Sequence, residues 1–166
     1  MNNIILIGMP GAGKSTIGME LSDKLSLPWI DTDQLIEKKM GHRLSEYIHM
    51  IGVEEFKKLE QEILLHLNVQ DSIISTGGSV IYSEAGMQHL KTLGKIFYLD
   101  VIYETIENRI AQNSNRGIVN SGGLDLRKLY NERIPMYNTW SDYIINANDK
   151  TIKEICSEII NHGYKI

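Results

Sequence analysis

The sequence GMPGAGKST occupies residues 8–16 and decides most of what this chain is expected to form. It fits the phosphate-binding pattern G-x-x-x-x-G-K-[ST]. An apolar run, residues 4–7, precedes it, and a helical pattern over residues 16–25 follows it, so the motif has the strand and the helix that it needs. A glycine-rich turn without a ligand is the alternative interpretation. The complete motif with both flanks favours a nucleoside triphosphate site.

Each position in this loop has a physical role. The glycines at 8, 11 and 13 allow a tight turn, so that successive N–H groups point at phosphate oxygens near the positive end of a helix. The lysine brings charge to the β- and γ-phosphates, and the serine hydroxyl is suited to ligate Mg²⁺. The motif therefore predicts that ATP and Mg²⁺ are bound by Gly11, Ala12, Gly13, Lys14, Ser15 and Thr16.

The length and the net charge of the chain limit the classes of protein to which it can belong. The 166 residues suffice for one domain, 1–166, and the net charge of −4 argues against nucleic acid or an anionic membrane as partner. No apolar run is long enough to span a bilayer, and the first strand begins at residue 3, which leaves no room for a signal peptide. The single cysteine, Cys156, fits a helix core and a reducing compartment. We expect a cytoplasmic monomer that acts on a small molecule.

Strand and helix patterns alternate along the chain. The β-rich segments are 3–8, 28–31, 72–76, 95–99 and 143–146, and the helical ones are 14–25, 33–40, 45–67, 84–93, 103–111, 125–140 and about 150–162. This alternation predicts an α/β fold, a parallel sheet with helices on both faces. Residues 112–123 are rich in Asn, Ser and Gly and are expected to be a functional loop.

Asp31-Thr32-Asp33 ends the second predicted strand, where open α/β sheets place their ligand sites. One carboxylate can support Mg²⁺ through its water shell, and the other can accept a hydrogen bond from a substrate hydroxyl. The alternative is that Asp33 caps the helix that follows.

Two other groups of residues are candidates for the same edge of the sheet. Thr76-Gly77-Gly78-Ser79 ends the third predicted strand, where paired glycines allow a ligand to approach the backbone, although a plain turn is equally compatible. Basic side chains could meet substrate anions, although most surface Lys and Arg are simply solvated; they are Lys57, Lys58, Arg109, Arg116 and Arg133.

The order of these motifs resembles the shikimate kinase family. The resemblance runs from residue 2 to about 146, and its motifs are residues 8–16, 31–33, 52–60, 75–78 and 132–137. It implies a three-layer P-loop fold of the nucleoside monophosphate kinase type, with a five-stranded parallel sheet in the order 2-3-1-4-5 and a lid at about 112–123. It also implies transfer of the ATP γ-phosphoryl group to a hydroxyl of shikimate, in aromatic amino acid biosynthesis.

The resemblance also implies roles for matching residues. Catalysis would fall to Lys14, Asp33 and the lid arginine Arg116, with Asp31 near the Mg²⁺ that Ser15 ligates. Arg109 would lie over the adenine, and Arg116 would reach the phosphates. The acceptor pocket would be formed by Asp33, Lys57, Gly77, Gly78 and Arg133, the last of which would pair with the substrate carboxylate.

This chain departs from the family at several positions. Lys57 stands where the family has arginine, and lysine lacks the two-pronged guanidinium. Ser79 replaces a third glycine, residues 117–119 (GIV) replace a proline and an apolar pair, and Thr139 replaces an acidic residue. The alternatives are therefore the same chemistry on another hydroxylated acid, a nucleotide-binding regulatory protein without phosphotransfer, and a nucleoside monophosphate kinase.

Overall fold

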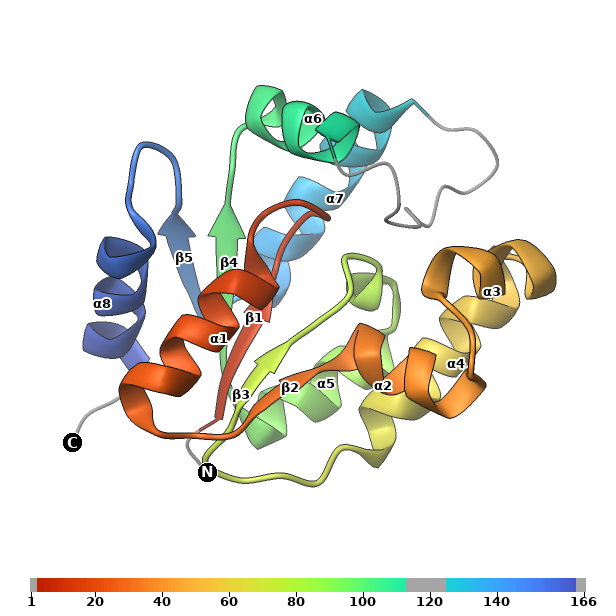
Figure 1. Cartoon of the computed structure of the whole chain (residues 1–166), viewed down its shortest axis with the longest axis horizontal. Coiled ribbons are helices and arrows are strands. Elements are labelled where there is room, and N and C mark those ends of the chain that lie inside the picture. Colours follow the sequence, from red (N-terminus) through yellow and green to blue (C-terminus); the bar gives the residue numbers. More distant parts are fainter. Residues whose placement is uncertain (1–2, 113–124, 164–166) are drawn as a thin grey trace.

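Runs of β-branched and aliphatic residues form a five-stranded parallel sheet. The computed structural model describes residues 3–112 and 125–163, and the strands are β1 (Asn3–Ile7), β2 (Trp29–Asp31), β3 (Ile73–Ser75), β4 (Gly94–Asp100) and β5 (Tyr143–Asn146). All neighbours pair in parallel, in the order β2-β3-β1-β4-β5 (Figure 1). The predicted fold class and strand order are confirmed, and predicted strand ends differ by at most one residue.

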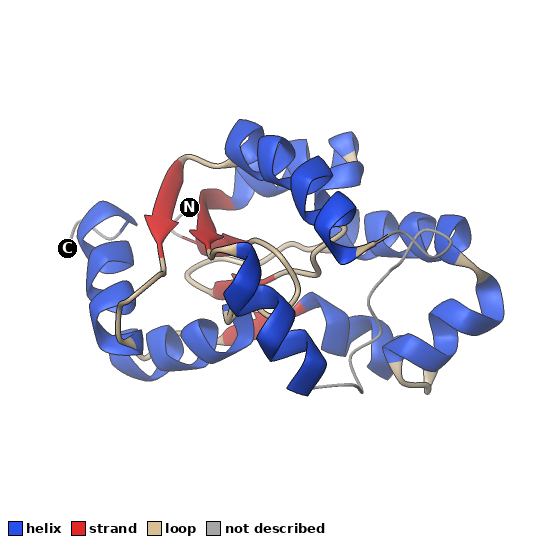
Figure 2. Cartoon of the chain, turned by 90° about the horizontal axis from the view of Figure 1, so that it is seen from above, coloured by secondary structure: helices blue, strands red, loops and turns tan. Residues whose placement is uncertain are grey.

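Helices cover both faces of this sheet. Within the described residues they are α1 (Lys14–Leu25), α2 (Thr32–Met40), α3 (Leu44–Ile51), α4 (Val53–His66), the 3₁₀ turn η1 (Val80–Tyr82), α5 (Glu84–Leu93), α6 (Tyr103–Gln112), α7 (Leu126–Trp140) and α8 (Ile152–Gly163). Figure 1 shows α1 and α8 on one face and α5 and α7 on the other. Seen from above, the strands lie enclosed by helices (Figure 2). Every residue of β1 is therefore buried, as expected for a central parallel strand.

The helix predicted over residues 45–67 is wrong as a single element, because two helices occupy that stretch. They meet at Gly52, whose φ of 82° and ψ of 164° lie outside the helical region. The Gly52 N–H donates the last hydrogen bond of α3, to Ile48 O at 2.9 Å. The Gly52 carbonyl accepts the first hydrogen bond of α4, from Phe56 N at 3.1 Å. Residues with a Cβ rarely adopt this backbone conformation, so the glycine determines the break.

Helices α2, α3 and α4 form a unit beside the β2 edge of the sheet (Figure 1). A small apolar cluster of its own holds this unit together, with Ile36, Phe56 and Leu59 buried. A much larger cluster surrounds the sheet. The lid predicted at about 112–123, with Arg116, lies outside the described residues apart from Gln112, which ends α6. None of the helices in the described part of the chain is long and apolar enough to cross a membrane.

Candidate active site

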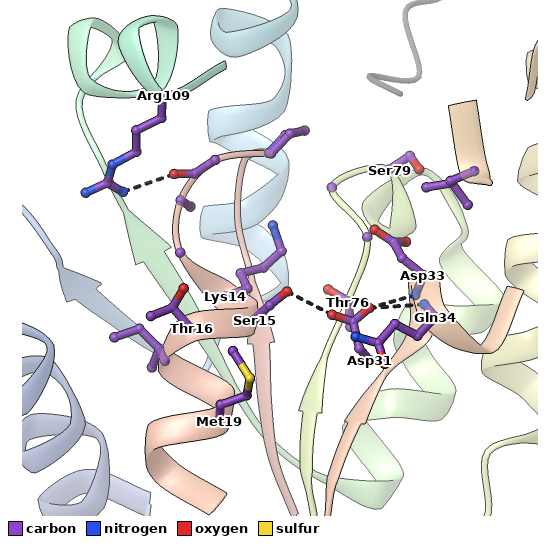
Figure 3. A pocket seen from close by; sticks show the side chains of 18 of the residues that line it. Lys14, Ser15, Thr16, Met19, Asp31, Asp33, Gln34, Thr76, Ser79 and Arg109 are labelled. Carbon is purple, nitrogen blue, oxygen red and sulfur yellow. Dashed lines mark hydrogen bonds between the residues drawn. The ribbon is translucent and has the colours of Figure 1, made fainter. Parts of the chain in front are cut away.

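A cavity of about 620 Å³ opens at the carboxyl ends of β1, β2 and β3. One side of it is the loop before α1, and the opposite side is formed by the end of β2 and the turn after β3 (Figure 3). Arg133 of α7 also lines it. This is the edge where parallel α/β sheets bind ligands. The predicted site residues that line it are Gly11, Ala12, Gly13, Lys14, Ser15, Thr16, Asp31, Asp33, Gly77, Gly78, Arg109 and Arg133.

The phosphate loop takes its shape from its glycines. Gly11 and Gly13 have φ values of 82° and 96°, and Gly13 begins α1 without a side-chain cap, which suits a helix end that receives an anion. Gly8 approaches β4 closely, because a Cβ there would lie 3.0 Å from Leu99 O. Arg109 Nη1 donates to Gly11 O at 3.0 Å, so this exposed arginine of α6 lies against the loop.

Lys14 is buried within the same loop, with 8% of its surface exposed. Its ammonium group donates to Gly8 O at 2.8 Å and to Met9 O at 2.9 Å. The charge is therefore held over the loop by two backbone carbonyls, where it can meet the phosphates of a bound nucleotide.

Ser15 and Asp31 form an oxygen pair beside the loop. Ser15 Oγ donates to Asp31 Oδ2 at 2.8 Å, while Asp31 Oδ1 accepts from Asp33 N at 3.0 Å and Gln34 N at 3.3 Å (Figure 3). Asp31 therefore caps α2, and the alternative that Asp33 is the cap is wrong. A hydroxyl and a carboxylate are hard oxygen ligands of the kind that Mg²⁺ prefers. The described residues contain no group of three or more His, Cys, Asp or Glu side chains placed to hold a metal.

Asp33 and Glu60 converge on Gly77. A Cβ on Gly77 would lie 2.7 Å from Asp33 Oδ1 and 2.6 Å from Glu60 Oε1, so any side chain there would displace both carboxyl groups. Glu60 is buried, and its Oε2 accepts from Ser79 Oγ at 2.8 Å. Burial, followed by the charge of Asp33, raises the pKa of Glu60 to about 8, so this carboxyl is largely protonated at neutral pH.

The turn after β3 connects to α7. A Cβ on Gly78 would lie 2.7 Å from Pro10 Cδ and 3.2 Å from Arg133 Nη1. Tyr137 OH donates to Gly78 O at 2.7 Å, and Arg133 is almost fully buried. The structure thus brings Asp33, Gly77, Gly78 and Arg133 together, as the resemblance implies for an acceptor pocket.

Lys57 does not join that group in the described structure. Its ammonium lies 3.2 Å from Glu54 Oε1 and 4.7 Å from the centre of the Tyr82 ring, and Lys57 is not among the residues that line the cavity. Ser79, where the family has a third glycine, directs its hydroxyl to Glu60.

Sequence reasoning missed several residues of the site. Trp29, Arg43, Leu44 and Phe56 line the cavity from three different elements, and no local pattern marks them. Glu60 could have been found, because it closes the 52–60 motif, and an acidic residue on an apolar helix face signals a buried carboxyl.

A P-loop at the end of a central parallel strand, a serine–aspartate pair suited to Mg²⁺ and an acceptor pocket in the same cavity define a P-loop kinase. The model of one family, described as shikimate kinase, matches residues 10–163. The chain belongs to the shikimate kinase family.

Individual relatives agree along the whole chain. The shikimate kinase of Caldanaerobacter subterraneus subsp. tengcongensis is 34% identical over 169 residues, covering 100% of this chain and 98% of the relative. The shikimate kinase of Helicobacter hepaticus is 38% identical, covering 96% of this chain and 95% of the relative. Among solved structures, shikimate kinase from Acinetobacter baumannii in complex with shikimate superposes with a TM-score of 0.87 at 28% identity, covering 97% of this chain and 92% of that one.

Proposed function

We propose that this protein catalyses ATP-dependent phosphorylation of a hydroxyl of shikimate, a step of aromatic amino acid biosynthesis. The observation that carries the proposal is that one cavity joins the phosphate loop to a pocket with a carboxylate, Asp33, and a buried guanidinium, Arg133. The carboxylate suits an acceptor hydroxyl, and the guanidinium suits an acid. Family membership supports the same acceptor.

On the donor side, the phosphate loop binds and orients the nucleotide. Backbone N–H groups of residues 11–16 hold the phosphates, and the Lys14 ammonium compensates negative charge on the transferring phosphoryl group. Arg109, which donates a hydrogen bond to the loop at Gly11 O, is proposed to lie over the adenine of the nucleotide. Arg116 is proposed as a further cation at the phosphates.

Ser15 and Asp31 would hold Mg²⁺, Ser15 as a ligand and Asp31 through bound water. The ion supplies charge compensation across the β- and γ-phosphates when it is bound. Asp31 also caps α2, so the residue that would support the metal fixes the direction in which α2 presents Asp33.

On the acceptor side, Asp33 orients the hydroxyl and accepts its proton. The bond formed joins the acceptor oxygen to the γ-phosphorus, and the bond broken joins that phosphorus to the β–γ bridging oxygen, so that ADP leaves. The backbone of Gly77 and Gly78 lets the acceptor approach, and Arg133, with Lys57, is proposed to bind its carboxylate.

The test is ADP release from the purified protein with Mg²⁺, ATP and a panel of acceptors: shikimate, quinate, gluconate and nucleoside monophosphates. Shikimate is expected to give a kcat/KM at least ten times that of any other, as expected when a site built to pair with polar groups meets its own substrate. A preference for another hydroxy acid would reject shikimate as the acceptor and retain the chemistry. The absence of ADP release with every acceptor would reject the kinase assignment.

We also propose that residues 1–166 act as a single domain, a cytoplasmic monomer that uses neither nucleic acid nor membrane as partner. The net charge of −4 supports the absence of nucleic acid and of anionic membranes as partners. Light scattering after size exclusion should give the mass of one chain, and a dimer would contradict the proposal.

A further inference from the structure

Tyr82, the last residue of η1, contacts both of the cations that are proposed to bind the acceptor carboxylate. Lys57 Nζ of α4 lies 4.7 Å from the centre of its ring, and Arg133 Cζ of α7 lies 5.3 Å from the same centre. Arg133 Nε also donates to the Tyr82 hydroxyl at 3.2 Å. One half-buried tyrosine thus contacts side chains from two helices that are distant in sequence.

The hydroxyl of Tyr82 is fixed on its other side as well. It donates to Glu132 Oε1 at 2.5 Å. Burial and the neighbouring Glu132 carboxylate raise the pKa of Tyr82, so the hydroxyl remains protonated at neutral pH and can donate to Glu132 while it accepts from Arg133. This arrangement fixes the plane of the Arg133 guanidinium, whose Nη1 lies on the Gly78 side, toward the cavity.

The aromatic ring of Tyr82 also reduces the repulsion between Lys57 and Arg133. Two like charges near one pocket repel, and an aromatic face attracts each of them. Lys57 receives further compensation from Glu54 Oε1 at 3.2 Å, but that pair is exposed on the Glu54 side and is therefore weak. A lysine has no planar fork to define its own geometry, so the ring holds its ammonium against the same side chain that Arg133 contacts.

We propose that Tyr82 is a positioning residue that holds Lys57 and Arg133 as a paired cation site for the carboxylate of the acceptor. The inference rests on the proposed function, since it concerns the same acceptor pocket. It assigns to Lys57 a defined place beside Arg133, and it makes η1, which follows the Gly77-Gly78 turn, part of the specificity for acids.

Two variants separate the hydroxyl from the ring. Tyr82→Phe removes the bonds to Arg133 and Glu132, and is expected to raise the KM for shikimate about fivefold, as for the loss of one hydrogen bond of ordinary net strength. Tyr82→Leu also removes the cation–π contacts, and should raise it roughly tenfold or more. In both variants kcat and the KM for ATP should stay within about twofold of wild type, because in the described structure Tyr82 contacts only residues proposed to bind or orient the acceptor and none of the phosphate loop.

A double-mutant cycle tests whether Lys57 acts through the ring. Lys57→Met should raise the KM for shikimate in the wild-type background and have a clearly smaller effect in Tyr82→Leu, because coupled residues are not additive. Tyr130→Phe is the matched control. It removes a tyrosine hydroxyl from α7 that donates to Val101 O at 3.0 Å, and it should leave the KM unchanged.

The outcomes separate this inference from the proposed function. Wild-type turnover of shikimate is measured first and tests the proposed function alone. The Tyr82 variants are then compared with wild type on whichever carboxylated acceptor of the panel the wild type phosphorylates. An unchanged acceptor KM in Tyr82→Leu, additivity with Lys57→Met, a parallel loss of kcat, ATP affinity and melting temperature, or a wild type that uses only uncharged acceptors would each overturn the role of Tyr82.

Discussion

In the proposed reaction Lys14 supplies positive charge to the transferred phosphoryl group, and in the structure its ammonium donates to two loop carbonyls. Lys14→Ala is therefore expected to raise the activation free energy by about 3 kcal/mol or more, as for the loss of one preorganised electrostatic contact. This corresponds to a decrease in kcat of roughly a hundredfold or more. ADP release measures the loss, and circular dichroism checks the fold. The control is Lys24→Ala at the other end of α1, where an ion pair with Glu20 at 3.9 Å is partly exposed. Normal turnover by Lys14→Ala would remove the loop from catalysis.

In the proposed mechanism Asp33 binds the acceptor hydroxyl, whereas Asp31, which bonds to Ser15 and caps α2, supports the metal. Asp33→Asn is expected to lower kcat by about 10²–10⁴-fold, because the group that accepts the proton is lost. The KM for ATP should hardly change. Asp31→Asn is the comparison, and should instead raise the Mg²⁺ concentration required. If Asp33→Asn weakened ATP binding and spared turnover, Asp33 would belong to the nucleotide side.

Glu60 makes stability depend on pH in a defined direction. Burial raises the pKa of Glu60 from its ordinary value of 4.5 to about 8 in the folded protein, so unfolding between these two pH values releases a proton. Stability therefore falls as pH rises through this window, with a slope of at most about 1.4 kcal/mol per pH unit. Glu60→Gln should flatten that slope in urea unfolding at pH 5, 6, 7 and 8.

The matched control for Glu60 is Glu62→Gln on the same helix. Glu62 is exposed, and the hydrogen bond from Lys39 lowers its pKa below 4.5, so it does not titrate between pH 5 and 8. Its variant should keep the wild-type slope. An unchanged slope in Glu60→Gln would mean that Glu60 is ionised in the folded protein.

At the scale of elements, the break between α3 and α4 depends on one glycine. Gly52 has φ 82° and ψ 164°, whereas Gly41, which ends α2, has φ 71° and ψ 14°. A Cβ would meet no atom within 4 Å at either site, so only the backbone conformation distinguishes them. Gly52→Ala should destabilise by about 1–3 kcal/mol, because its region is essentially restricted to glycine.

Asparagine gives the sharper comparison of the two turns. The left-handed region of Gly41 tolerates asparagine, so Gly41→Asn should change the free energy of unfolding by less than about 1 kcal/mol, while Gly52→Asn should lose as much as Gly52→Ala. Denaturant unfolding measures both. Equal losses at the two glycines would show that the break does not depend on the conformation of Gly52.

At the scale of the whole molecule, two apolar clusters of unequal size hold the chain together. The cluster around the sheet includes all of β1 apart from Asn3, whereas the α2–α4 unit buries Ile36, Phe56 and Leu59, and α3 has no buried residue. Few buried contacts mean low local stability. Amides of α2–α4 should therefore exchange with deuterium faster than those of β1 and β4, and shikimate should slow them. Equal protection without ligand would show that the molecule opens as one unit.

Local patterns in the sequence were sufficient to locate the strands and the phosphate loop. Each strand carries its own apolar run, and the phosphate loop is specified by consecutive residues, so β1, the loop and α1 could be predicted before the structure. The strand order came from the resemblance and not from the periodicity of the sequence. The break at Gly52 was visible as a glycine, but the helical pattern on both sides concealed it.

The site itself required the tertiary structure. Only folding shows that Asp31 caps α2 while Asp33 faces Gly77, that Ser79 bonds to Glu60, and that Lys57 and Arg133 meet at Tyr82. These contacts join residues that lie on different elements, and their pKa values and charges depend on burial that no local pattern contains. The sequence determined by itself which backbone would receive a phosphate, because consecutive residues build that loop. The tertiary structure decided how the site is charged, because Asp33, Glu60 and Arg133 come together around the Gly77-Gly78 turn only when α2, α4 and α7 pack against one another.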